Sequence, residues 1–109
     1  MTLVEELKIL LKDLAPSFTE TELSTFIAEA LLELRLSEPT YETRNLILDI
    51  GYRQALKTML ANFDRYFRFS HEGGSVDRIG TYENLLSLYE KITSEIEKRK
   101  PAALKTIKL

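Results

Sequence analysis

The chain has 109 residues, 44% hydrophobic and 29% charged, with a formal net charge of −2 at pH 7. We expect one soluble domain, because no apolar run approaches the roughly 20 residues of a membrane span. With no cysteine and one histidine the chain lacks the usual ligands for zinc, and the absence of a signal-like start predicts synthesis inside the cell.

Charge is distributed unevenly along the chain. Residues 1–43 carry nine acids and three bases, a net charge of −6, whereas residues 44–109 carry eight acids and twelve bases, a net charge of +4. Such polarity either steers head-to-tail association of identical subunits or is satisfied within one subunit. Both interpretations are open at the level of sequence.

The first two helices are predicted by their start and stop signals. Thr2 with Glu5, and Thr19 with Glu22, each have the spacing of a capping box, and Pro16 separates the two helices. The second helix should end near Leu36. The apolar faces expected to be buried comprise Leu3, Leu7, Leu10, Leu11 and Leu14, then Leu23, Phe26, Ile27, Ala30, Leu31 and Leu34.

A long central helix is expected from about Thr40 or Thr43 to Phe69, on the order of 40 Å in length. Gly51 inside it suggests a close helix crossing or a bend. Its apolar stripe comprises Leu48, Tyr52, Ala55, Leu56, Met59, Leu60, Phe63, Tyr66 and Phe67.

The last helix should follow the Gly73-Gly74 break, with Ser75 as its cap, and run to about Lys98. Its expected buried positions are Ile79, Tyr82, Leu85, Leu86, Tyr89, Ile92 and Ile96. The predicted architecture is therefore all-α: a bundle of about four helices with a long central helix. Residues 1–100 form the domain, and residues 101–109 form a flexible C-terminal tail.

The segment FSHEGGSVDR, residues 69–78, is the one place where a histidine, glycines, acids and a base crowd together. Adjacent side chains such as those of Ser70, His71 and Glu72 point in different directions, so they do not make a hydrolytic triad. Gly73 and Gly74 lack the lysine or the preceding strand of known phosphate loops. We expect a helix-to-helix turn, with no catalytic residue, no cofactor and no metal.

Basic and aromatic residues suggest contact surfaces instead. Arg53 and Lys57 lie four apart, and Lys98-Arg99-Lys100 form a short basic cluster, which leaves non-specific DNA contact open although the pI is near 5.5. Tyr66 or Phe69 either faces a neighbouring protein or joins the core. The candidate interaction residues are Tyr66, Phe69, His71, Gly73, Gly74, Asp77, Arg78, Lys98, Arg99 and Lys100.

Three segments carry a resemblance to a known family: Phe18–Ala30 (FTETELSTFIAEA), Gln54–Ala61 (QALKTMLA), and Phe69–Tyr89 with its Gly73–Arg78 turn. In them the chain resembles small structural proteins of the phage head-tail connector type, also called adaptor or head-completion proteins. It departs from commoner members in having no identifiable long inserted β-hairpin or extended loop.

The resemblance implies a helical subunit of a ring at the capsid vertex, with DNA passing through the lumen. It implies other copies of the chain as partners, together with portal or tail-side connector proteins, and a location in the host cytoplasm during assembly and then in the virion. The 69–78 turn and the 99–109 tail become candidate contact elements. The alternative is a small helical adaptor or regulator that binds another protein through one groove or helix face.

Overall fold

The computed structural model describes residues 1–66 and 78–101, and within these ranges the chain is helical with no strand. The all-α fold class is therefore confirmed. The elements in chain order are α1 (Leu3–Leu11), the 3-10 helix η1 (Lys12–Ser17), α2 (Glu20–Glu33), α3 (Arg44–Ala61), the single turn α4 (Phe63–Tyr66) and α5 (Arg78–Arg99).

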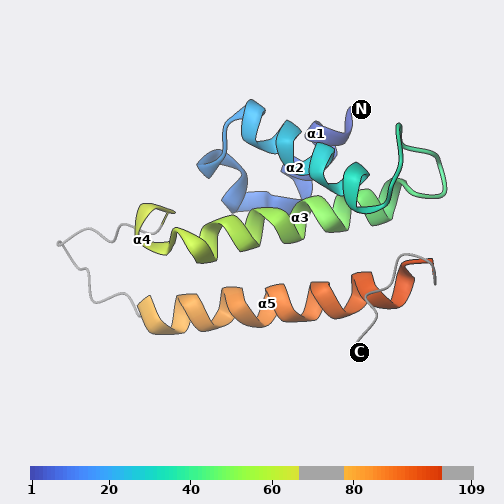
Figure 1. Cartoon of the computed structure of the whole chain (residues 1–109). Helices are drawn as coiled ribbons and strands as arrows, with labels where there is room; N and C mark the ends of the chain where they lie inside the picture. The colour runs from blue at the N-terminus through green and yellow to red at the C-terminus, as the bar shows by residue number, and fades with distance from the viewer. Residues whose placement is uncertain (67–77, 102–109) are drawn as a thin grey trace.

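Helix α3 lies at the centre of the molecule (Figure 1). Helices α1 and α2 cover one side of it, and α5 runs antiparallel to it along the other side (Figure 1). The principal extents of 49 × 37 × 16 Å describe a flat stack of three layers. Because α3 is the main neighbour of α5, much of the α5 surface faces solvent.

Both predicted capping boxes are present. The Thr2 hydroxyl accepts the backbone N–H of Glu5 at 3.1 Å, and the Thr19 hydroxyl accepts that of Glu22 at 3.1 Å. In each box the glutamate carboxylate also accepts the backbone N–H of the threonine, at 3.3 and 2.9 Å. These local bonds explain why the starts of α1 and α2 could be predicted so closely.

The core is built where α1, α2 and α5 meet α3. Gly51 of α3 is buried there, and a Cβ at this position would lie 3.3 Å from Ile27 Cδ1 and 3.5 Å from Leu7 Cδ2. The predicted close crossing at Gly51 is therefore confirmed. The largest fully buried side chains are those of Leu7, Leu23, Ile47, Ile50, Leu56, Met59 and Ile96.

The predicted end of the central helix was wrong, since α3 stops at Ala61 and spans 18 residues, or about 27 Å. Asn62 leaves the helical conformation with φ −127° and ψ 45°. The backbone N–H and the side-chain amide of Asn62 both donate to the carbonyl oxygen of Thr58, each at 3.1 Å, and so cap the end of the helix. α4 then forms a separate turn, and Phe67–Phe69 lie outside the described residues.

Two positions predicted to be buried are exposed. Helix α1 ends at Leu11, where Lys12 takes a positive φ of 53°, and Leu10 is 39% exposed. Tyr82 of α5 is 38% exposed, and its ring packs edge-on against Phe63 at a centroid distance of 5.3 Å. The other described positions of the α5 stripe lie against α3 to varying depth, with Leu85 and Ile96 buried.

Candidate interaction surface

Four of the candidate interaction residues have described side chains: Tyr66, Lys98, Arg99 and Lys100. Arg78 is the first residue of α5. The expected turn at 69–78 remains a prediction, because the positions Phe69, His71, Gly73, Gly74 and Asp77 lie outside the described residues.

Tyr66 joins α4 to the start of α2. Its ring is half-buried 5.3 Å from the ring of Phe18, and its hydroxyl donates to Glu22 Oε2 at 3.2 Å. Burial, followed by the nearby Glu22 carboxylate, raises the pKa of Tyr66. Of the two interpretations offered by the sequence, this residue fits the one in which it packs at the edge of the core.

The cluster of charges between α2, α3 and the end of α5 was not foreseen. Its centre is Glu33, in the last turn of α2, which pairs with Arg53 of α3 and with Lys100 Nζ at 2.8 Å. Lys100 Nζ also lies 3.1 Å from Glu97 Oε2. The side chains of Arg53 and Lys100 are only 11% and 7% exposed, so these charges are largely removed from water.

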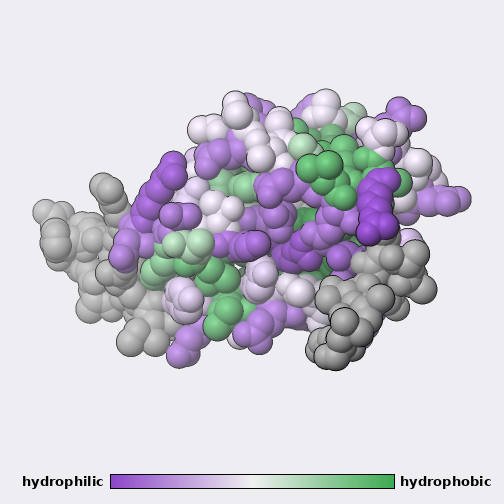
Figure 2. All heavy atoms as spheres, in the orientation of Figure 1, coloured by the Kyte–Doolittle hydropathy of each residue, from purple (hydrophilic) through white to green (hydrophobic). Residues whose placement is uncertain are grey.

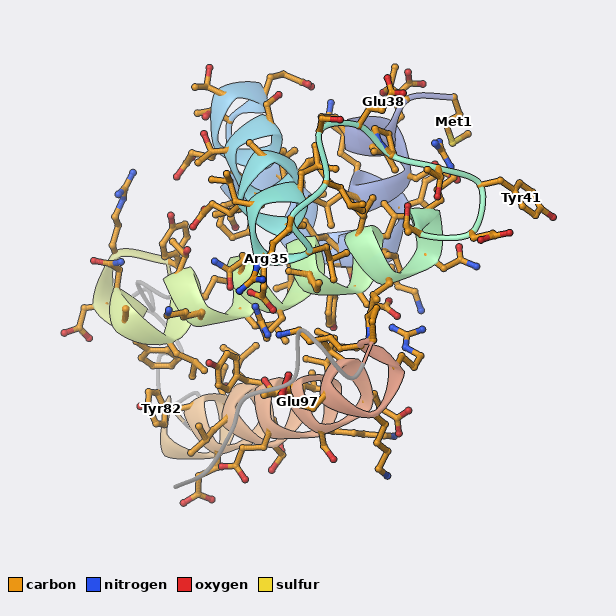
Figure 3. The ribbon with its side chains drawn as sticks, turned by 45° about the vertical axis from the view of Figure 1, so that its right-hand side comes forward. Met1, Arg35, Glu38, Tyr41, Tyr82 and Glu97 are labelled. Atoms are coloured by element: carbon orange, nitrogen blue, oxygen red, sulfur yellow. The ribbon has the colours of Figure 1, made fainter. Side chains whose placement is uncertain are left out.

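This burial is compensated by pairing. Desolvation alone would raise the pKa of Glu33, but hydrogen bonds from Arg53 and Lys100 outweigh it and the pKa is lowered. Desolvation would lower the pKa of Lys100, but hydrogen bonds to Glu33 and Glu97 raise it. Figure 3 shows Glu97 on the side of α5 turned toward α3, where this cluster ties α5 to the rest of the fold.

The three residues of the predicted basic cluster at the end of α5 therefore have different environments. Lys98 is exposed, whereas Arg99 pairs with Asp49 of α3 and Lys100 is buried in the Glu33 cluster. Arg53, considered for DNA contact from sequence, is also buried there. The position of Glu33 in the last turn of α2 could have indicated this cluster from the sequence. A negative charge there is disfavoured by the helix dipole, so a cationic partner is expected.

The charge polarity of the chain is at least partly satisfied within one subunit. Arg44 pairs with Glu6, and both Arg53 and Lys100 pair with Glu33. Each of these contacts joins an acid of residues 1–43 to a base of residues 44–109. The structure thus supports the intramolecular interpretation of the uneven charge.

An exposed apolar surface lies beside a hollow at α1. Met1, Ile9 and Leu10 are 76%, 61% and 39% exposed, and they line a groove of about 460 Å³. We call it the α1 groove; its lining is Met1, Glu6, Ile9, Leu10, Asn45, Leu48, Asp49 and Arg99. Half of these residues are apolar and half are polar or charged, a mixture that is found on protein-binding surfaces.

A second hollow, of about 380 Å³, lies along α5. It is lined by Asn84, Ser87, Leu88 and Lys91, which share one face of the helix, and Leu88 is 44% exposed. On the face shown in Figure 2, apolar side chains gather over α2 and over the ends of α3 and α5 nearest α4, with hydrophilic residues between them.

The described residues contain no group of three or more His, Cys, Asp or Glu side chains that could hold a metal ion. Among the same residues, no helix combines the length and the apolar character needed to cross a bilayer. No protein-family model, curated protein or solved structure matches the chain.

Proposed function

We propose that the chain is a structural assembly protein that acts by binding copies of itself, as a subunit of a ring joining the head and tail of a phage. The observation that carries the proposal is the α1 groove, with Met1, Ile9 and Leu10 exposed around it. The resemblance of Phe18–Ala30 and Gln54–Ala61 to connector proteins supports the same class. The mechanism is burial of apolar surface, without a chemical reaction.

Ring formation requires two different surfaces on each subunit, because a head-to-tail contact joins unlike patches. The α1 groove and the Leu88 hollow provide an unlike pair, and α1 and α5 lie on opposite sides of α3 (Figure 1). Burying one large apolar side chain contributes about 1.5–3 kcal/mol, and association costs about 4–15 kcal/mol. One such contact is therefore weak, and ring closure, which provides every subunit with two contacts, strengthens it.

The proposed partners beyond the ring are portal or tail-side connector proteins. Non-specific contact with DNA in the lumen belongs to the same proposal. Of the bases considered from sequence, Lys57 and Lys98 are exposed and available for it, whereas Arg53 and Lys100 are buried.

Light scattering over a range of concentrations tests the proposal. We expect the mass of the unmodified protein to rise above the 12.6 kDa of one chain, and the mass of Ile9→Arg to stay there. Ile9 is 61% exposed, so the substitution should leave folding intact. Ser24→Arg, at an exposed position of α2, is the matched control and should associate normally. Equal association of Ile9→Arg and the control would contradict the proposal.

A second candidate is a small helical adaptor that binds a different protein. The observation that favours it is the Leu88 hollow, because an exposed leucine flanked by polar residues on one helix face suits docking of a partner helix. This function predicts a strict monomer or dimer in the same light-scattering series. It also predicts that Leu88→Arg, and not Ile9→Arg, abolishes partner binding.

A further inference from the structure

A third hollow lies where the described chain ends. Its volume is about 210 Å³, far more than a single water molecule needs. We call it the Pro101 hollow; its lining is Leu34, Leu36, Glu42, Thr43, Leu46, Arg99 and Pro101. Three leucines provide its apolar part, and Pro101 itself is one wall.

We propose that residues 102–109 of the same chain fold back into the Pro101 hollow. The chain passes from the end of α5 directly into the wall of the hollow, because Pro101 is part of the lining. Lys100 is held by Glu33 and Glu97, so the chain enters its last segment from an anchored position. Pro101 has no N–H to donate and disfavours the helical conformation at Lys100, so the chain must turn away from the axis of α5 at the hollow.

The composition of the segment, Ala-Ala-Leu-Lys-Thr-Ile-Lys-Leu, matches an apolar hollow that also contains an acid. Leu104 is three residues beyond Pro101, within about 10 Å along an extended chain. It is thus within reach of the leucines of the hollow. Lys105 follows it directly and suits the carboxylate of Glu42, another residue of the lining.

The covalent connection at Pro101 favours the segment of the same molecule. A segment attached beside the hollow has a high effective concentration there. Its binding also avoids the loss of translational and rotational entropy that the binding of a second molecule would cost. The segment of the same chain is therefore favoured over that of a neighbour. This inference does not rest on the proposed assembly role, because it describes an isolated subunit.

The absence of cysteine allows a direct test by disulfide trapping. The variant Leu36→Cys with Leu104→Cys should oxidise to an intramolecular disulfide, since docking brings the two positions within bonding range. The control pair is Ser24→Cys with Leu104→Cys, because Ser24 is exposed on α2 and lies roughly 15 Å of helix rise before Leu34 of the hollow. We expect the first pair to close at least about tenfold faster than the control, at a rate independent of protein concentration.

Equal rates for the two pairs would overturn the proposal. Disulfide-linked dimers whose yield rises with protein concentration would also overturn it, because they would show that the tail of another copy occupies the hollow. A second measurement without cysteine is hydrogen exchange of the full chain. Leu104→Asp should accelerate exchange in residues 34–46, whereas Thr106→Asp, with the same charge change, should not. Unchanged exchange in Leu104→Asp would also overturn the proposal.

Discussion

At the scale of single residues, Glu33 is the acid on which two largely buried bases converge. It is an acid in the last turn of α2, where the helix dipole disfavours a negative charge, yet it receives Arg53 from α3 and Lys100 from the end of α5. One carboxylate thus connects three helical segments. It also anchors the chain immediately before Pro101, which links this residue to the placement of the C-terminal segment.

Replacing Glu33 should change both stability and its dependence on acid. The pKa of Glu33 is lowered on folding, so its contribution is present above the unfolded value of about 4.3 and is lost as the pH falls through the folded pKa. We expect Glu33→Gln to lower the free energy of unfolding at pH 7 by about 1–3 kcal/mol, because Arg53 and Lys100 lose their shared partner.

Urea unfolding between about pH 3 and pH 7 provides the measurement, and the variant should lose less stability on acidification than the unmodified protein. Some acid dependence should remain, because hydrogen bonds from Thr2 and Thr19 also lower the pKa of Glu5 and Glu22. Glu95→Gln, at an exposed position of α5, should match the unmodified protein. An unchanged acid slope in Glu33→Gln would show that this pairing does not stabilise the fold.

At the scale of helices, the features predicted most accurately from the sequence were those that depend on hydrogen bonds between residues close together in the chain. The capping boxes at Thr2 and Thr19 lie within three residues, so their pattern is complete in the sequence. The break at Asn62 has no glycine or proline to mark it, and the side-chain bond from Asn62 to Thr58 that accompanies it is not a pattern that the sequence displays. Leu10 matches the apolar period of α1, but its exposure depends on where neighbouring helices lie.

The crossing of α3 with α1 and α2 should be sensitive to side-chain size at Gly51. An added Cβ would meet the flexible end of Ile27 at 3.3 Å while removing a helix penalty of about 1 kcal/mol, so Gly51→Ala should be nearly neutral. Gly51→Val adds two further methyl groups into a filled space and should cost about 1–3 kcal/mol in urea unfolding. Equal stability of the two variants would indicate a looser crossing.

The end of α2 offers a stabilising substitution. Arg35 has a positive φ of 57°, the N–H of Arg35 bonds the carbonyl of Leu32, and the N–H of Leu36 bonds that of Leu31, which together form a Schellman motif. Glycine is the residue preferred at this left-handed position. Arg35→Gly should therefore raise the free energy of unfolding by up to about 1 kcal/mol. A lower melting temperature than that of the unmodified protein would contradict this.

At the scale of the whole molecule, the sequence predicted an all-α fold but not its contact surfaces. Helical period and caps are local, whereas the α1 groove exists only because α1, α3 and the end of α5 meet there. The basic residues at 98–100 suggested an exposed cluster. Lys100 is instead buried, because it pairs with Glu33, which is distant from it in the sequence. Tertiary proximity, which no local pattern encodes, decides which apolar and charged residues remain on the surface.

The proposed assembly requires that this flat helical chain associates with copies of itself through the α1 groove. Electron microscopy of the concentrated protein shows whether that association closes into a defined particle. We expect closed rings for the unmodified protein and for Ser24→Arg, and none for Ile9→Arg. Single subunits at every concentration, or rings of undiminished number in Ile9→Arg, would contradict it.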